Sequence, residues 1–206
     1  MINYVVSLGP VLAGATAVSV YLLWPSGASV ANQIQSSISG KDYLQLVESR
    51  DSGYWTKFKE LYKNFKGEKL DGVTEETLPD WCEKNLSIKA SDKSEKELEF
   101  ARQWCVVDVR SVKAAAKGLG KTPVSEISSG EQTTAWQTAW EYYKNNKGSK
   151  NLDIVDGDVK TEETQGKEAG GSKLQAWCNS KESKLMYEWG GEDQTHEKYM
   201  LWCVKQ

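Results

Sequence analysis

The chain has 206 residues, enough for one domain or two small ones, and its net charge is -3 with charged residues of both signs making up 27% of the sequence. This balance gives no electrostatic reason to expect nucleic-acid binding, which requires a basic face. A mixed-sign surface is typical of a solvated helical protein. We therefore expect an all-α fold, with no strand after residue 25.

The N-terminal segment is mostly apolar from Ile2 to Trp24, and the first charged residue is Lys41. A helix over residues 2–24 rises about 1.5 Å per residue and would cross the roughly 30 Å hydrocarbon core of a bilayer. We therefore expect an N-terminal transmembrane helix, or uncleaved signal, within residues 1–28. It would contact the membrane through residues 2–24 and leave the bulk of the chain extracellular.

A cleaved signal peptide is the main alternative, because Ala13-Gly14-Ala15 and Ala15-Thr16-Ala17 resemble small-residue cleavage sites. Against it, no basic residue precedes the apolar run, and the run exceeds the usual 7–15 residues, roughly, of a signal core. A buried soluble helix is less favoured, because Gly9-Pro10 suits a core helix poorly. Neither flank carries charge that would set the orientation in the membrane.

The remainder of the sequence is an internal repeat. YWTKFKELYKNFKG (54–67) aligns with AWQTAWEYYKNNKG (135–148). Each copy continues with Thr-Glu-Glu-Thr, then Leu-x-x-Trp-Cys, and closes on Trp-Cys-Val. Motifs repeated in the same order indicate a repeated structural unit. We expect two tandem small helical-bundle modules, over residues 29–108 and 109–206.

Each module is expected to begin with a short helix, over 30–39 and 109–118. The next helix of the first module is expected from about Ser52 to Lys66, with Asp51 or Ser52 as its cap and Gly67 as a left-handed stop. Its counterpart carries the apolar stripe Trp136, Ala139, Trp140 and Tyr143, with Thr133 or Thr134 as cap and Gly148 as stop.

The second predicted helix of each module carries Leu-x-x-Trp-Cys. Leu78, Trp81 and Cys82 stand at positions i, i+3 and i+4, so they share one helix face. Pro79 fits the first turn of this helix. In the second module, Ser172 to Gln175 matches a capping box. The polar segment 148–172 before it is expected to be a long surface loop.

The third predicted helix carries the closing Trp-Cys pair. In the first module Asp92 is the expected cap. The apolar face is formed by Leu98, Ala101, Trp104 and Cys105 in the first module, and by Tyr199, Trp202 and Cys203 in the second. Burying a Trp and the adjacent Cys requires a wide apolar face, which a helix inside a small bundle has.

All four cysteines directly follow a tryptophan. The repeat favours the disulfides Cys82–Cys105 and Cys178–Cys203 if the modules are exported. Each would close a loop of roughly two dozen residues, worth about 3 kcal/mol. The alternative is four reduced cysteines that serve as small buried hydrophobes. The expected core anchors are Trp55, Trp81, Trp104, Trp136, Trp177 and Trp202.

The sequence favours no catalytic residue, metal site, cofactor or small-molecule substrate. It has no Cys-x-x-Cys, and its single histidine is His196. GLGKT (118–122) lacks the strand and first glycine of a phosphate-binding loop and is expected to be a helix-terminating turn. HEKYM (196–200) lacks the second histidine of a zinc protease. The carboxylates of SEKELE (94–99) are expected on a solvated helix face.

Within the two modules, one tryptophan lies outside the repeated motifs. Trp189 precedes Gly190-Gly191 and is the candidate exposed contact residue. Most other tryptophans stand at helical core spacing, which favours packing over sugar stacking.

The apolar, Gly- and Ala-rich N-terminus, the helix with Trp and Tyr-Lys, the Leu-x-x-Trp-Cys motif and the closing Trp-Cys-Val occur in an order that resembles the large paralogous protein families of haemotropic mycoplasmas. The resemblance covers essentially the whole chain, although the N-terminus departs from the family by lacking a basic residue. It implies a membrane-anchored or exported protein involved in antigenic variation or contact with the host red cell. It carries over no activity and no functional residue.

We therefore expect a membrane-anchored, exported surface protein without enzymatic activity, acting in host interaction or antigenic diversity. The alternative is an adhesion module that binds one host cell-surface protein through residues 148–172 or around Trp189. A thiol-redox enzyme is less favoured, because Cys-x-x-Cys is missing and there is one histidine.

Overall fold

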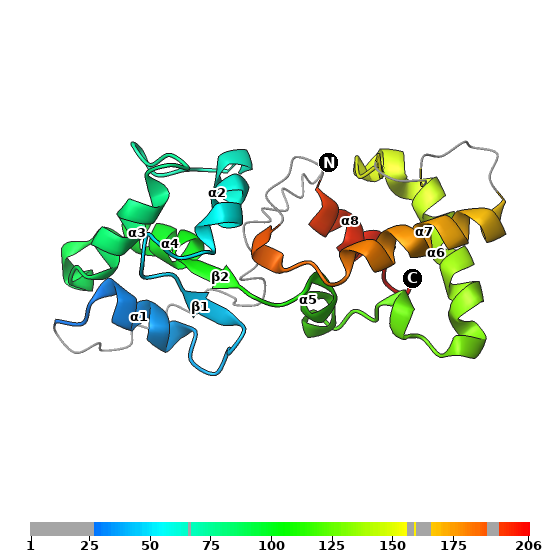
Figure 1. The fold of residues 1–206 in the computed structure, drawn as a ribbon, viewed down its shortest axis with the longest axis horizontal. Coiled ribbons are helices and arrows are strands. Elements are labelled where there is room, and N and C mark those ends of the chain that lie inside the picture. Colours follow the sequence, from blue (N-terminus) through cyan, green and yellow to red (C-terminus); the bar gives the residue numbers. More distant parts are fainter. Residues whose placement is uncertain (1–26, 66, 156–158, 160–165, 189–193) are drawn as a thin grey trace, which may run out of the picture. The chain divides into compact units, whose positions relative to one another are not determined.

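The computed structural model describes residues 27–65, 67–155, 159, 166–188 and 194–206. Within these ranges the chain is mostly helical, with eight α-helices and one two-stranded sheet (Figure 1). It divides into two compact units, the first ending at Val109 and the second spanning Arg110–Gln206. We call them unit 1 and unit 2. The expected boundary between modules, after residue 108, lies one residue from this division.

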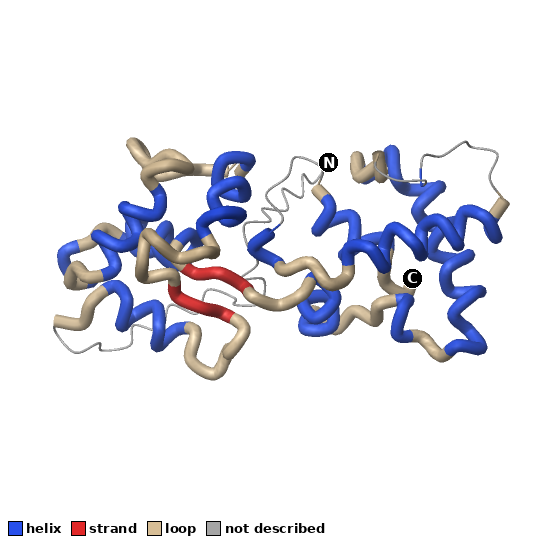
Figure 2. Tube along the Cα trace, viewed as in Figure 1, coloured by secondary structure: helices blue, strands red, loops and turns tan. Residues whose placement is uncertain are grey.

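Unit 1 contains one short sheet that the sequence did not predict. The elements of unit 1 are α1 (Val30–Ser37), β1 (Leu44–Leu46), α2 (Trp55–Asn64), α3 (Leu78–Leu86), the 3-10 helix η1 (Ala90–Asp92), α4 (Glu95–Trp104) and β2 (Val106–Asp108). The strands pair antiparallel and lie side by side in Figure 2. The prediction of no strand is wrong, because three residues are too few to show the alternation that marks a strand.

Helix α2 begins and ends differently from the prediction. It starts at Trp55, and Tyr54 holds the N-cap position without a side-chain hydrogen bond. The predicted caps Asp51 and Ser52 are therefore wrong. The helix ends at Asn64 with Phe65 as its C-cap, so Gly67 is not the predicted stop either. This helix is held mainly by its buried face, as is usual for short helices.

Helix α4 has a capping box in place of the predicted Asp92 cap. Asp92 lies in η1, and α4 starts at Glu95. The Ser94 hydroxyl accepts the backbone N–H of Glu97, while the Glu97 carboxylate accepts the backbone N–H of Ser94. Two backbone donors are thus satisfied reciprocally at the helix start.

The core of unit 1 is built around Trp104, which is fully buried. The Tyr62 ring meets it edge-on with a centroid distance of 4.7 Å, and the Phe65 ring does so at 5.1 Å. Phe58 packs beside it at 5.8 Å. The Tyr62 hydroxyl donates to the Val73 carbonyl at 2.9 Å, which ties the segment after α2 to the core.

Unit 2 repeats the order of helices seen in unit 1. Its elements are α5 (Val112–Gly118), the 3-10 helix η2 (Val124–Glu126), α6 (Ser129–Lys150), α7 (Lys167–Lys181), the 3-10 helix η4 (Met186–Glu188) and α8 (Thr195–Trp202). In place of the sheet, its described residues form two isolated bridges, Pro123 with Val204 and Ser111 with Leu185. The short helices expected near 30–39 and 109–118 are confirmed as α1 and α5.

Helix α6 is longer than predicted at both ends. It starts at Ser129, so Thr133 and Thr134 lie inside it and do not cap it. Gly148 is also helical, and the chain leaves the helix at Asn151, whose φ of 53° is left-handed. Asn tolerates this conformation better than most residues.

The predicted loop 148–172 is shorter than expected, because α6 extends to Lys150 and α7 begins at Lys167. Its connecting part also contributes to the core, since Ile154 and Val159 are buried. The Tyr143 hydroxyl accepts the Ile154 backbone N–H at 3.0 Å. This contact parallels the one that Tyr62 makes in unit 1.

The capping box predicted at Ser172 is also wrong. Ser172 lies inside α7, and its hydroxyl donates to the Glu168 carbonyl at 3.1 Å. Helix α7 starts instead after Gly166, which makes no side-chain cap.

Two glycines let α7 approach α6 closely. A Cβ on Gly170 would lie 2.0 Å from the Trp140 ring, and a Cβ on Gly171 would lie 3.2 Å from the backbone nitrogen of Gln137. Any larger residue at Gly170 would have to displace a fully buried tryptophan. The pair therefore sets the packing of the two helices, which cross in Figure 1.

No helix built from the described residues combines the length and apolar character that a membrane crossing needs. The segment predicted to cross the membrane, residues 2–24, lies outside the described residues.

Candidate functional site

The first chemical centre is the Cys82–Cys105 disulfide of unit 1. Cys82 lies on α3 and Cys105 follows the last residue of α4. Their sulfurs are bonded at 2.03 Å and their Cα atoms lie 5.6 Å apart, within the usual range for a bridge. Both residues are fully buried. The predicted pairing is confirmed.

The second centre is the Cys178–Cys203 disulfide of unit 2, which joins α7 to the end of α8 in the same way. The Cα atoms lie 5.7 Å apart, and both residues are buried. This predicted pairing is confirmed too. The alternative of four reduced cysteines is wrong, since none of the four is free.

The predicted tryptophan anchors are placed almost as expected. Five of them are buried, namely Trp55, Trp104, Trp136, Trp177 and Trp202. Trp81 is only half-buried and packs edge-on against Phe100 at 4.8 Å. The predicted contact residue Trp189 lies outside the described residues.

Buried disulfides of this kind are structural. Thiol–disulfide exchange requires a thiolate to reach a sulfur atom. Here Cys82 and Cys105 have no exposed surface, and Cys178 and Cys203 are at most 2% exposed. The geometry therefore favours stabilisation of the two units over redox catalysis.

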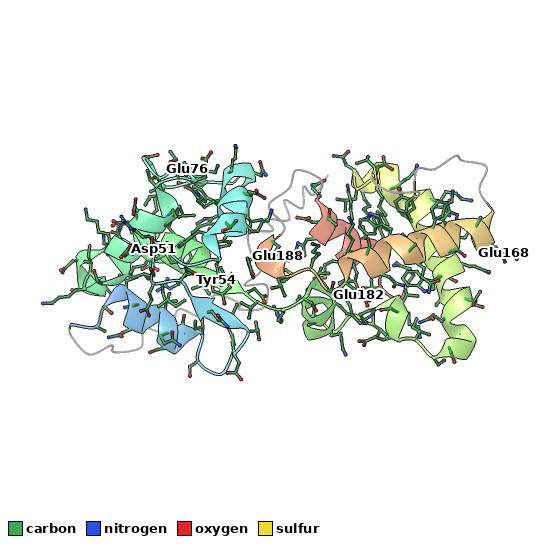
Figure 3. All side chains as sticks on the ribbon, viewed as in Figure 1. Asp51, Tyr54, Glu76, Glu168, Glu182 and Glu188 are labelled. Carbon is green, nitrogen blue, oxygen red and sulfur yellow. A yellow bond between two sulfur atoms is a disulfide. The ribbon has the colours of Figure 1, made fainter. Side chains whose placement is uncertain are left out.

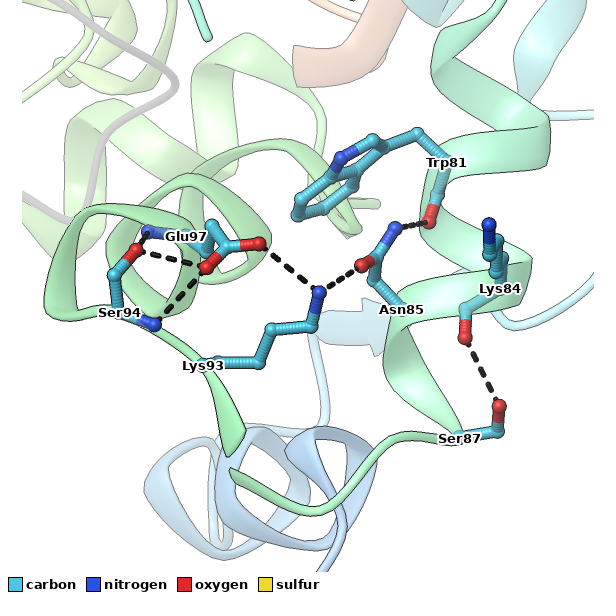
Figure 4. A network of polar contacts seen from close by, with 7 residues as sticks. All are labelled: Trp81, Lys84, Asn85, Ser87, Lys93, Ser94 and Glu97. Atoms are coloured by element: carbon cyan, nitrogen blue, oxygen red, sulfur yellow. Dashed lines mark hydrogen bonds and ion pairs between the residues drawn. The ribbon is translucent and has the colours of Figure 1, made fainter. Parts of the chain in front are cut away.

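A polar network lies beside the disulfide core of unit 1. Lys93, between η1 and α4, donates to Asn85 Oδ1 on α3 and to Glu97 Oε1 on α4, the second at 3.0 Å. Asn85 Nδ2 donates to the Trp81 carbonyl at 2.7 Å, which fixes the side-chain amide. The Lys93 side chain is 12% exposed. Figure 4 shows Lys93 between the other two groups.

Glu97 is the charged end of this network. It accepts the Ser94 hydroxyl at 2.8 Å in addition to the Ser94 backbone N–H at 3.0 Å. The Ser94 backbone N–H, Lys93 and the Ser94 hydroxyl together lower the pKa of Glu97 from 4.5 to about 2. The carboxylate therefore stays ionised over the whole neutral range.

Unit 2 carries a separate ion-pair cluster between α5, η2 and the end of α7. The Glu182 carboxylate, labelled in Figure 3, accepts the Ser125 hydroxyl at 2.9 Å and pairs with Lys113 at 3.3 Å. Glu126 pairs with Lys117 at 3.0 Å. These charges are balanced and partly exposed. We therefore interpret the cluster as surface ion pairs that hold α5, η2 and the end of α7 together.

The motifs that resemble catalytic signatures have ordinary structural roles. In GLGKT, Gly118 ends α5 and Gly120 adopts a φ of 73°, so the predicted helix-terminating turn is confirmed. HEKYM lies within α8. Within the described ranges, no group of three or more His, Cys, Asp or Glu side chains could hold a metal ion.

Sequence reasoning missed the Lys93–Asn85 contact, because neither residue belongs to a motif and their contact depends on how α3 meets α4. A signal for Glu97 was present. Ser94-x-x-Glu97 has the capping-box spacing, which marks Glu97 as an anchored residue and not merely part of a solvated face.

Comparisons of the chain with protein-family models, with curated proteins and with solved structures give no match. The features that bear on function are therefore the chain's own: two buried disulfides, the unit 1 network and the N-terminal sequence.

Proposed function

We propose that this chain is a membrane-anchored, exported surface protein without enzymatic activity, acting in host interaction or antigenic diversity. The observation that carries the proposal is one buried disulfide in each unit. Disulfides form and persist mainly in oxidising surroundings outside the cytosol. Small helical units of about 100 residues also have limited cores, so a covalent link adds useful stability.

The N-terminal sequence supplies the proposed anchor. The uncharged apolar run over residues 2–24 is long enough to cross a bilayer as a helix. The resemblance to surface-protein families of haemotropic mycoplasmas supports the same assignment. An anchor followed by disulfide-bonded units suits a displayed protein, because disulfides persist in oxidising surroundings.

The surface of the units suits display. Among the described residues, the large apolar side chains that are clearly exposed are Leu119 and Val155. Most of the remaining apolar surface is internal, and many exposed charges are paired. A surface that takes little part in packing can change in sequence at little cost in stability, which a role in antigenic diversity needs.

The two competing functions have less support. A thiol-redox enzyme needs an accessible sulfur, and the four sulfurs are buried. The adhesion alternative relied on residues 148–172 or on the surroundings of Trp189. In the first segment, 148–150 belong to α6 and 167–172 to α7, whereas Trp189 lies outside the described residues. Both ends of that segment are therefore helical.

Limited proteolysis of intact cells that produce the full chain tests the proposal. We expect externally added protease to remove both units while a cytosolic marker stays intact. The matched control is a variant lacking residues 2–24, which should leave the membrane fraction. Full protection of the wild-type protein in intact cells, with cleavage only after lysis, would show that it is not displayed.

Thiol trapping gives an independent check. An alkylating reagent added to intact cells before lysis should find no free thiol in the displayed protein, and should find four after reduction in denaturant. Labelling of all four cysteines before reduction would refute an oxidising location.

A further inference from the structure

We propose that Lys93 and Asn85 react with each other in folded unit 1 to form an intramolecular isopeptide bond, with Glu97 relaying the proton. The product would be a covalent bond from the end of α3 to the residue before the α4 cap. This inference is separate from surface display and requires no partner, metal or cofactor.

The three reacting groups are already in contact. Lys93 touches both the Asn85 carbonyl oxygen and the Glu97 carboxylate, so nucleophile, electrophile and base share one site. Asn85 is held by its bond to the Trp81 carbonyl. Groups fixed at contact distance react with effective molarities of about 10⁵–10⁸ M in well-oriented cases. That advantage is available to a reaction that occurs once per molecule.

The chemical step balances without an oxidant. Glu97 accepts a proton from the Lys93 ammonium, and the free amine attacks the side-chain carbonyl carbon of Asn85. A bond forms between the Lys93 nitrogen and this carbon, and the bond from the carbon to the Asn85 nitrogen breaks. The attacking nitrogen passes a second proton to the leaving nitrogen, and Glu97 returns the first. One ammonium and one amide become one secondary amide and one ammonium ion.

The surroundings favour amide formation over hydrolysis. Asn85 is 7% exposed and the Lys93 side chain is 12% exposed, so little water reaches the site. The Trp81 ring, drawn beside the three groups in Figure 4, is backed by the buried Phe100 ring at 4.8 Å. An apolar wall excludes water that would compete as nucleophile.

The capping box limits the rate. Its hydrogen bonds, together with the one from Lys93, lower the pKa of Glu97 to about 2, which makes the carboxylate a weak base. Transfer of the Lys93 proton is therefore uphill, and the reaction is slow compared with folding. A time course at mildly alkaline pH, where more amine is unprotonated, is accordingly the right assay.

Intact mass spectrometry of the purified full chain provides the test. We expect the mass to fall by one ammonia molecule during incubation, in addition to the loss of four hydrogens for two disulfides. Tryptic digestion should yield peptide 85–89 joined to peptide 90–96, because the modified Lys93 resists cleavage. A mass that stays unshifted, with a separate peptide ending at Lys93, would overturn the proposal.

Substitutions then test each role. Asn85→Asp should still crosslink but lose one water molecule in place of ammonia. Lys93→Arg should remain folded by circular dichroism and keep its full mass. Glu97→Gln should slow bond formation by about a hundredfold or more, the usual contribution of a general base. Crosslinking of Glu97→Gln at the wild-type rate would remove the proposed proton relay.

The matched control is Lys84→Arg. Lys84 is an exposed residue on the same helix as Asn85, so this variant should crosslink at the wild-type rate. Conversion of Asn85 to Asp by water, detected without any joined peptide, would show that the site hydrolyses its amide and would also overturn the proposal.

Discussion

Units 1 and 2 share a covalent and aromatic centre. In unit 1 the Trp104 ring meets Tyr62 edge-on at 4.7 Å beside the disulfide. In unit 2 the Trp202 ring meets Tyr143 in the same way at 5.3 Å. Each tyrosine hydroxyl also bonds the backbone of the segment that follows its helix. The repeated sequence signals therefore correspond to one repeated packing arrangement.

Around this centre the two units fill space differently. Unit 2 loses three aromatic rings that contact Trp104 or Tyr62 in unit 1, because Phe58, Phe65 and Phe100 correspond to Ala139, Asn146 and Lys198. It gains Trp140, which is fully buried against Gly170, and the buried Tyr199 of α8 at the position of Ala101. Aromatic volume has moved to Trp140, at the contact between α6 and α7, and to Tyr199 on α8.

The difference shows which features define the module. The disulfide and the Trp–Tyr pair occur in both units, whereas the surrounding aromatic rings do not. Cores tolerate such exchanges when total volume is kept. We infer that the shared centre fixes the fold of each unit and that the remaining packing is replaceable.

Removing the central tryptophan should cause the largest loss of stability, and the loss should be similar in both units. Trp104→Ala and Trp202→Ala are each expected to lower the free energy of unfolding by about 3–5 kcal/mol, through the lost burial and the cavity left behind. Urea unfolding followed by circular dichroism would measure both. A small loss in either unit would mean that its core does not depend on this ring.

A milder change at the same positions should separate the units. The Trp202 indole N–H donates to the Leu152 carbonyl at 3.0 Å, whereas that of Trp104 has no hydrogen-bond partner within the described part of the chain. Trp202→Phe should therefore cost about 1 kcal/mol more than Trp104→Phe. Equal losses in the same urea assay would argue that the Leu152 contact contributes nothing.

The two disulfides should contribute similar amounts to the free energy of unfolding of their units. Cys82→Ala/Cys105→Ala should lower the free energy of unfolding of unit 1 by about 3 kcal/mol, and the corresponding double substitution should do the same in unit 2. The reason is that the bridged residues are 23 and 25 positions apart, so the closed loops are nearly equal. Two clearly unequal shifts in the unfolding midpoint would contradict this account.

The sequence was most informative where a residue pattern has one structural solution. The four Trp-Cys pairs, aligned by the repeat, led directly to both bridges, and the position of Leu78, Trp81 and Cys82 placed α3. Helix ends were harder to predict, because several Ser, Thr and Asp side chains stood near each start. Tertiary packing, which the sequence does not show, set the observed starts of α2 at Trp55 and of α6 at Ser129.

Features that depend on two distant segments could not be read from the sequence. The contact of Lys93 with Asn85 arises only when α3 packs against α4. The close crossing of α6 and α7 likewise requires Gly170 to face Trp140, and in the sequence that glycine looked like part of a loop. The segments β1 and β2 are too short to show the alternation of apolar and polar residues that predicts a strand, so their pairing could not be predicted.

The close approach of α7 to α6 at Gly170 lies within unit 2. Adding a side chain at this position should therefore change the stability of that unit alone. Gly170→Ala should destabilise unit 2 by about 1–3 kcal/mol, because the new methyl group would collide with the Trp140 ring. Gly148→Ala is the matched control, since it meets nothing within 4 Å and should stabilise α6 by about 0.5–1 kcal/mol. If both variants were stabilised in thermal unfolding, the crossing would be looser than described.

A smaller contrast between the units should appear in their dependence on pH. The pKa of Glu97 lies near 2 in the folded state, below its usual 4.5. Its contribution to stability is therefore present above about pH 4.5 and is lost as the pH falls toward 2. The stability difference between wild type and Glu97→Gln should shrink over that interval. Thr195 occupies the corresponding position in unit 2 and offers no such group.

At alkaline pH the contrast should be reversed, because there the stability of unit 2 should depend on a titrating side chain. Tyr199 of unit 2, where unit 1 has Ala101, is buried near the Glu182 and Glu126 carboxylates, and burial followed by these charges raises its pKa above 10. Because the folded-state pKa is the higher one, this stability is complete below pH 10 and is lost as the pH rises beyond it. Unit 2 of wild type should therefore weaken faster there than unit 2 of Tyr199→Phe, measured by urea midpoints. Parallel decline of the two proteins would mean that Tyr199 ionises as readily in the folded state as in the unfolded chain.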